Sequence, residues 1–339
     1  KKTKKTKNIV NSRVPILAFI CMLPLVHKIK NGRIEMNSNN EDHNYNKQDD
    51  ANDVGRCCYN SKNFAANNGG NINCKKNDNQ YQIDQKDDKR IYISEQEVLF
   101  FESDFTGNLR LPYIFCFMQE AAQKHAAILS FGHEDLLQDD RLWVLSRVYL
   151  KIMKQPVVED KIKIKTWHKG SDGIFAFRDF IITDEKDNVL VLATTSWVVV
   201  DQKTRKPIRN LEFLNNESKV NASSIEKSFE RLPKFAKEIK DDLENHVDKN
   251  ITVKEFQAMY SGIDINRHVT NSKFVEWICD ALGDKLFEGY LIEEFQINYN
   301  NEMHYHDKVK VYLKMLDELN YICDTSNSNF QAKILLKQK

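Results

Sequence analysis

One structural unit, a long helix followed by strands, is present twice in this chain, and this repeat limits the fold more than any other feature. Placing Asp104 on Asp264 without a gap makes apolar residues coincide along the helix that follows. The next strand aligns separately, because "EDKIKI" and "HDKVKV" match with Asp160 on Asp307. The two offsets are 160 and 147 residues, so the first copy has 13 more residues between helix and strand.

Each copy is expected to contain one helix. The spacing of apolar residues predicts a helix over 111–132, ended by Gly132, and a second over 272–283, capped by Thr270 or Asn271. The runs "EDKIKIK" and "FAFRDFIITD" alternate as half-buried antiparallel strands do, whereas "VLVLATTSWVVVD" is continuously apolar and suits a central strand. A long helix wrapped by an antiparallel sheet is an α+β arrangement.

The N-terminal quarter differs in composition. Residues 1–90 begin with a basic stretch and 13 largely apolar residues, too few for the roughly 20 that a spanning helix needs. There are three alternatives for this start of the chain: a targeting segment, a weak anchor, or upstream sequence outside the working protein. Residues 36–90 are rich in Asn, Asp, Lys and Gln, which predicts a disordered linker. We therefore expect an extension over 1–90, a first domain over 91–215 and a second over 250–339.

Overall charge and cysteine content exclude little. The net charge of +1 argues for neither a nucleic-acid nor a membrane-surface partner. Cys116, Cys279 and Cys323 are the cysteines in the part expected to fold, each in an apolar setting, so they are interpreted as buried reduced thiols.

Titratable residues are concentrated in the second copy. In "DINRH", Asp264, Asn266 and His268 are spaced two apart, so an irregular or extended loop would point all three the same way, beside a helix N-terminus. Glu302 follows the next strand. At the positions of Asn266, His268 and Glu302, the first copy has Thr106, Asn108 and Gln155. Chemistry is therefore expected in the second copy, with the first as structure and as part of a substrate pocket.

Simpler interpretations of these residues exist. Asp264 and Asn266 could form turn bonds only, with His268 a satisfied surface histidine. Glu302 alone would be an ordinary surface glutamate. The cluster of His304, His306 and Asp307 is explained by strand alternation, and no metal site is expected.

The region from about 92 to 339 resembles the acyl-acyl-carrier-protein (acyl-ACP) thioesterases of plant plastids and bacteria, a family of tandem hotdog domains. The resemblance rests on "FESDFTGNLRLPYIFCFMQEAAQKHA", "LWVLSRVYLKI", "FAFRDFIITDEKDNVLVLATTSWVVVDQKTRKPIR" and "YSGIDINRHVTNSKFVEWICDAL". It implies a double hotdog fold and hydrolysis of the thioester between a fatty acyl chain and its carrier protein, which ends chain elongation, without a cofactor.

By the same resemblance, Asp264, Asn266 and His268 match the catalytic loop of the family, and Glu302 in "YNNEM" matches the glutamate of its "YRREC" strand. Asn300 and Asn301 replace two arginines, and Met303 replaces the cysteine of plant members. The absent cysteine favours carboxylate chemistry: Glu302 or Asp264 activates water, or a carboxylate attacks directly.

Substrate-contacting residues follow from the same hypothesis. The first helix is the expected wall of an acyl tunnel, with Phe115, Phe117 and Met118 as its residues. Because the carrier protein is acidic, the basic segment "QKTRKPIR" is the candidate contact, through Arg205, Lys206 and Arg209.

Other functions remain open at this level. They are a hotdog thioesterase acting on acyl-CoA, a dehydratase of the same fold, and a non-catalytic module that binds acyl chains or the carrier protein. The expected partner is acyl-loaded carrier protein, with a homodimer and membrane contact left open. The resemblance implies bacterial cytoplasm or plastid stroma.

Overall fold

A computed structural model describes residues 75–77, 80–82, 89–209, 214, 218–226, 229–242 and 249–339. The basic and apolar start of the chain, interpreted as a targeting segment, lies outside the described residues. Within the segment expected to be a disordered linker, β1 (Lys75–Asn77) and β2 (Gln80–Gln82) pair antiparallel. Two strands so close in sequence pair at a small entropic cost of loop closure.

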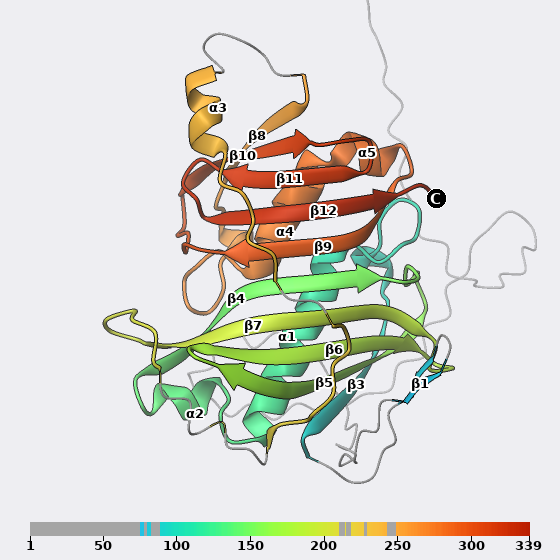
Figure 1. Cartoon of the computed structure of the whole chain (residues 1–339), viewed down its shortest axis with the longest axis vertical. Coiled ribbons are helices and arrows are strands. Elements are labelled where there is room, and N and C mark those ends of the chain that lie inside the picture. The colour runs from blue at the N-terminus through green and yellow to red at the C-terminus, as the bar shows by residue number, and fades with distance from the viewer. Residues whose placement is uncertain are drawn as a thin grey trace, which may run out of the picture. The chain divides into compact units, whose positions relative to one another are not determined.

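Ten strands form one antiparallel sheet in the order β3-β5-β6-β7-β4-β9-β12-β11-β10-β8 (Figure 1). The first five strands in sequence form one half and the last five form the other, in mirrored order. β4 and β9 join the halves, from the pair Arg147 and Asn298 to the pair Lys151 and Glu294. The bounds are β3 Ile91–Glu97, β4 Arg141–Ile152, β5 Lys161–Asp172, β6 Phe175–Asp184, β7 Val189–Asp201, β8 Ile251–Gln257, β9 Leu291–Tyr299, β10 Lys308–Met315, β11 Asn320–Thr325 and β12 Phe330–Lys337.

The two long helices, α1 (Leu111–Ile128) and α4 (Asn271–Ala281), lie on the same face of the sheet (Figure 1). α1 has 18 residues and α4 has 11, so seven of the 13 extra residues of the first copy lengthen its helix. This arrangement confirms the expected tandem hotdog fold. The shorter helices are η1 Phe100–Glu102, α2 His133–Leu137, α3 Ala236–Asp242, η3 Tyr260–Gly262 and α5 Gly283–Phe287.

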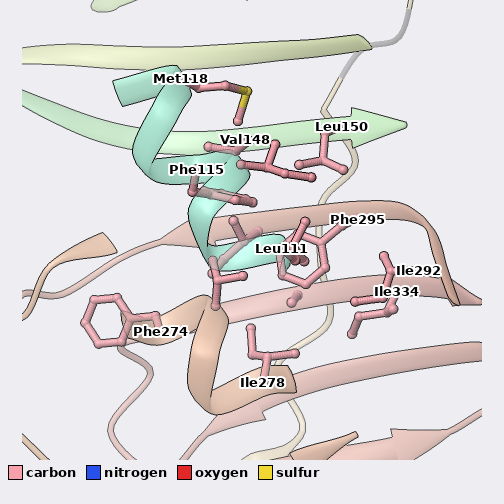
Figure 2. Packing of buried hydrophobic residues seen from close by; sticks show 14 of the residues in the cluster. Leu111, Phe115, Met118, Val148, Leu150, Phe274, Ile278, Ile292, Phe295 and Ile334 are labelled. Carbon is pink, nitrogen blue, oxygen red and sulfur yellow. The ribbon is translucent and has the colours of Figure 1, made fainter. Parts of the chain in front are cut away.

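One hydrophobic core extends through both copies. Phe115 and Met118 of α1 point into it, and the Phe115 ring meets that of Phe295 on β9 edge-on, with centroids 5.8 Å apart. Phe274 and Ile278 of α4 belong to the same cluster (Figure 2). The apolar faces of both helices are therefore buried against the sheet, as amphipathic helices require.

The first helix ends four residues before the expected stop. Its last residue is Ile128, and Ser130 then adopts a left-handed φ of 62°. Gly132 does not end α1 but begins α2, where a Cβ would lie 2.9 Å from the Cα of Ala127. The glycine is therefore needed because the chain folds back closely onto the helix it has just left.

The described residues between the copies, 218–226 and 229–242, lie on the face of the sheet opposite α1 and α4 (Figure 1), and two buried aspartates hold them there. On β6, Asp179 accepts a hydrogen bond from the backbone N–H of Ser224 at 2.7 Å. On β11, Asp324 accepts bonds from the N–H groups of Phe235 and Ala236, both at 2.8 Å. This segment therefore does not cover the side of the sheet on which α1 and α4 lie.

Candidate active site

The loop before α4 is a tight turn built by one carboxylate oxygen. Oδ1 of Asp264 accepts hydrogen bonds from the backbone N–H of Asn266 at 2.8 Å and of His268 at 3.1 Å. The N–H of Asp264 donates to the carbonyl of His268 at 2.8 Å, and Arg267 adopts a left-handed φ of 65°. The turn fixes the positions from which Asn266 and His268 project.

The first copy makes the same turn without the reactive side chains. Oδ1 of Asp104 accepts from Thr106 at 2.8 Å and from Asn108 at 3.1 Å. The residue after each turn forms one backbone hydrogen bond to the segment that follows the next long strand. The N–H of Leu109 donates to the carbonyl of Pro156, and the N–H of Val269 donates to the carbonyl of Met303, both at 2.8 Å. Each acceptor follows directly after Gln155 or Glu302, so the alignment of those two positions is confirmed.

His268 and Glu302 meet in the second copy. The Nε2 atom of His268 lies 3.4 Å from Oε2 of Glu302, somewhat longer than a usual hydrogen bond. The backbone around His268 pairs with that around His304, and the two imidazole rings lie edge-on with centroids 4.9 Å apart. A distance of this length between two catalytic groups is common in sites that contract when the substrate binds.

Arg205 also reaches this pair, from the first copy. Its guanidinium forms an ion pair with Oε1 of Glu302, so the two oxygens of the carboxylate face different partners. The sequence assigned Arg205 to the carrier surface, because nothing in its segment shows which way the loop after β7 turns.

The surroundings of His268 favour the neutral form of its imidazole. Burial lowers the pKa of His268 below its ordinary value of 6.5, and the charges of His304 and Arg205 lower it further, against an opposing effect of Asp264. A neutral imidazole at physiological pH can either accept or donate a hydrogen bond, depending on its tautomer.

All four residues assigned by resemblance line one cavity of about 580 Å³. Its wall is shared between the copies. From the first copy come one face of α1, parts of α2, β4 and β7, and Arg205. The lining residues are Cys116, Gln119, Glu120, Gln123, His133, Leu142, Trp143, Val144, Leu145, Trp197, Arg205, Asp264, Ile265, Asn266, His268, Val269, Asn271, Phe274, Tyr299, Asn300, Asn301 and Glu302.

The N-terminus of α4 adjoins this cavity through Asn271. Thr270 occupies the N-cap position, as one of the two expected capping residues, but its side chain makes no capping hydrogen bond. The first N–H groups of a helix have no partner within the helix, and they favour negative charge. The helix end therefore offers donors next to the titratable residues.

The residues expected in the acyl tunnel lie elsewhere on α1. Phe115 and Met118 are 1% and 2% exposed in the core and do not line the cavity, and Phe117 packs against the same core. The opposite, more polar face lines it instead. Cys116 on this face is exposed, so the expectation of a buried thiol is wrong for that residue, while Cys323 is buried.

Met303 points away from the site. Its side chain is 1% exposed and belongs to the core, whereas Glu302 lines the cavity. Adjacent residues in extended backbone face opposite sides. Lys206 and Arg209, the other two expected carrier contacts, are exposed. Among the described residues, no group of three or more His, Cys, Asp or Glu side chains could hold a metal ion.

A second cavity of about 520 Å³ lies beside the equivalent loop of the first copy. Asp104, Thr106 and Gln155 line it, together with residues of α4 such as Lys273 and Glu276. The two cavities are thus related by the repeat, but the first copy has Asn108 and Gln155 at the positions of His268 and Glu302.

Comparisons with known proteins agree with this geometry. The model of the acyl-ACP thioesterase N-terminal domain matches residues 89–215, and that of the C-terminal domain matches residues 245–338. A dodecanoyl-[acyl-carrier-protein] hydrolase of Cinnamomum camphora is 27% identical over 193 residues, 55% of this chain and 49% of the relative. An oleoyl-acyl carrier protein thioesterase of Coriandrum sativum is 24% identical over 205 residues, 57% of this chain and 54% of the relative. The chain spans about half the length of these curated relatives.

Solved structures show the same fold. An acyl-ACP thioesterase from Bacteroides thetaiotaomicron superposes with a TM-score of 0.64 at 23% identity, over 73% of this chain and 98% of that chain. The 12:0-ACP thioesterase from Umbellularia californica gives 0.62 at 18% identity, over 74% and 98%. With both domain models matched in order along the chain, the protein belongs to the acyl-ACP thioesterase family.

Proposed function

We propose that this protein hydrolyses the thioester of a fatty acyl chain on acyl carrier protein and releases the free fatty acid. One observation supports this most strongly. Asp264, Asn266, His268 and Glu302 line a single cavity, large enough for part of an acyl chain, while the first copy has Asn108 and Gln155 at the positions of His268 and Glu302.

Glu302 is the general base in this mechanism. Asp264 is the less suitable carboxylate, because its Oδ1 already accepts two backbone hydrogen bonds in the same turn that Asp104 makes. Glu302 removes a proton from a water molecule, and the resulting hydroxide attacks the thioester carbonyl carbon. Collapse of the tetrahedral intermediate breaks the C–S bond, and the proton on Glu302 passes to the leaving thiolate.

Neighbouring groups orient and stabilise these species. His268, held neutral and 3.4 Å from Glu302, is placed to orient the water, and the Asn266 amide lies on the same cavity wall. The N–H of Thr270 donates to the carbonyl of Gly262 at 2.9 Å, so the N–H groups of Asn271 and Ser272 at the start of α4 are the ones suited to the oxyanion that develops on the carbonyl. Direct attack by Glu302 would form an anhydride, and if water then attacks the glutamyl carbonyl, a first turnover in ¹⁸O-water leaves an unlabelled enzyme oxygen in the product.

The acyl chain occupies the cavity between the copies in this proposal. Its walls include the outward face of α1 and the aromatic side chains of Trp143, Trp197 and Phe274. Carrier protein docks at the cavity mouth, where exposed Lys206 and Arg209 suit its acidic surface. Phe115, Phe117 and Met118 do not contact the acyl chain in this proposal. They pack in the core and support α1, whose other face lines the cavity.

The relatives support a proposal for the compartment. The plant proteins are described as chloroplastic, which supports the plastid stroma, with bacterial cytoplasm as the alternative. Of the helices that the structure describes, none has the length and apolarity to cross a membrane.

Release of free fatty acid from a panel of acyl-ACP and acyl-CoA thioesters tests the function, with Glu302→Gln measured in parallel. Glutamine keeps the shape of the side chain but accepts no proton, so turnover should fall about 10²- to 10⁴-fold. Turnover confined to acyl-ACP and lost in the variant supports the proposal. Preference for CoA thioesters changes the substrate class, and binding without turnover would indicate a non-catalytic acyl-binding protein.

A further inference from the structure

The active-site glutamate is held by a residue from the other copy. Arg205 lies in the loop after β7, in the first copy, and pairs with Oε1 of Glu302 in the second. Oε2 of the same carboxylate faces Nε2 of His268. Both side chains of the ion pair are 37% exposed, and a pair so accessible to water contributes little to folding stability. Its consequence is therefore geometric.

The loop that presents Arg205 is tightly bonded. Oδ1 of Asp201 accepts hydrogen bonds from the N–H and the hydroxyl of Thr204, both at 2.7 Å, and the N–H of Arg205 donates to the carbonyl of Asp201 at 2.9 Å. The N–H of Ile208 returns to the carbonyl of Val199 at 2.8 Å.

Arg205 itself has a left-handed φ of 57°, a conformation that residues with a Cβ adopt rarely and at some cost in energy. The turn thus directs one long side chain toward the cavity from a constrained backbone. Lys203, two residues earlier, instead donates a hydrogen bond from Nζ to Oδ2 of Asp140 at 2.6 Å.

We propose that Arg205 is a positioning residue for the thioester hydrolysis, holding the Glu302 carboxylate so that its second oxygen faces His268. This role rests on the proposed function. A guanidinium suits it because its planar fork holds a carboxylate in a fixed orientation, which the point charge of a lysine does not. The catalytic centre would then require both copies, which gives the non-catalytic copy a direct part in the chemistry.

The charged and titratable groups that face His268 come from three segments. Asp264 belongs to its own loop, His304 and Glu302 follow β9, and Arg205 comes from the loop after β7. Removing the positive charge of Arg205 removes one of the influences that keep His268 neutral, so the acid limb of the pH–rate profile should move to higher pH.

The test compares Arg205→Gln, Arg205→Lys and the matched control Lys203→Gln. Each is assayed with acyl-ACP and with the N-acetylcysteamine thioester of the same acyl chain, which has no carrier protein and no phosphate. We expect Arg205→Gln to lower kcat about 10- to 100-fold on both substrates, with KM nearly unchanged and the acid limb shifted upward. Arg205→Lys should be intermediate, and Lys203→Gln should equal the wild type on the small thioester.

Other results overturn the role. Unchanged kcat in Arg205→Gln, with an active wild type, shows that the ion pair does not position Glu302. A loss confined to acyl-ACP and expressed in KM assigns Arg205 to carrier docking instead. A wild type inactive on every thioester refutes the proposed function, and this role with it. Thermal melting of each variant separates these results from loss of folding.

Discussion

Asp104 and Asp264 form the same turn at equivalent places in the two copies, each accepting backbone hydrogen bonds of 2.8 and 3.1 Å at Oδ1. The copy without the imidazole and the glutamate therefore keeps the aspartate. Much of what Asp264 does is to shape the loop, and the reactive groups were added to, or lost from, a shared frame. This pair gives a built-in control for separating structure from chemistry.

Alanine at either aspartate should remove the two backbone hydrogen bonds of the turn, and at Asp104 also the one from the Thr106 hydroxyl, and lower the free energy of unfolding by about 1–2 kcal/mol. The loss of stability should be similar at the two positions, since the turns match. Activity should differ: we expect Asp264→Ala to reduce kcat at least about 100-fold, because Asn266 and His268 project from its turn, and Asp104→Ala to leave kcat within about twofold.

Denaturant unfolding and steady-state kinetics on both variants check this prediction. Equal losses of activity at the two positions would show that the turn of the second copy has no special part in catalysis. Adding Asp264→Asn separates charge from shape, since asparagine retains an acceptor oxygen.

Sequence patterns were sufficient for the parts of this protein that depend on local periodicity. A helix beginning at residue 111 and a strand over 189–201 follow from spacing that one segment determines by itself, although the helix ends at Ile128 and not at Gly132. The register of the repeat also followed, because a shift by one residue in a strand would exchange its buried and exposed faces.

Contacts between the copies could not be predicted in the same way. The cavity wall on α1 consists of Cys116, Gln119, Glu120 and Gln123, spaced three and four apart, while the sheet takes the apolar face of the helix. Assigning the apolar residues to the tunnel ignored that the sheet covers them first. Similarly, no local pattern shows that the loop of Arg205 ends beside Glu302, about a hundred residues later in the chain.

The pH–rate profile should depend on His304. Burial, then His304, lower the pKa of His268 below 6.5, so the neutral imidazole persists to lower pH than in a free histidine. If the neutral form is the active one, the acid limb of the wild type lies below pH 6.5. His304→Gln removes a positive influence and should move that limb to higher pH, with kcat at pH 8 unchanged.

The control for this prediction is His306→Asn. His306 is exposed, stacks on Tyr305 and has a left-handed φ of 73°, which asparagine tolerates. It should leave the profile unchanged. A profile that is the same in all three proteins would show that the acid limb does not report His268.

The buried imidazole of His168 should make folding stability depend on pH. Burial, then the charges of Arg178 and Lys219, lower its pKa to about 4, against an ordinary value of 6.5. The unfolded chain therefore binds a proton that the folded protein excludes. The contribution is fully present above pH 6.5 and is lost as pH falls toward 4, by up to about 3 kcal/mol.

Chemical denaturation at several pH values between 7 and 4.5 measures this effect as a difference between the wild type and His168→Gln. The wild type should lose stability more steeply as the pH falls, and His306→Asn should follow the wild type. Parallel curves for wild type and His168→Gln would mean that the pKa of His168 in the folded protein is close to its ordinary value.

The close approach at Gly132 should tolerate no side chain. A Cβ there would lie 2.9 Å from the Cα and 3.1 Å from the Cβ of Ala127, so Gly132→Ala must push α2 away from the end of α1. We expect a loss of about 1–3 kcal/mol in unfolding free energy, as overpacking usually costs. Because His133 of α2 lines the cavity, the acyl-chain preference should also change.

Gly283→Ala is the matched control. Gly283 begins α5, has an ordinary φ, and a Cβ there would meet nothing within 4 Å, so the substitution should be neutral or slightly stabilising. Equal melting temperatures for the two variants would show that the backbone at α2 yields without cost, in which case α2 would not be a fixed wall of the cavity.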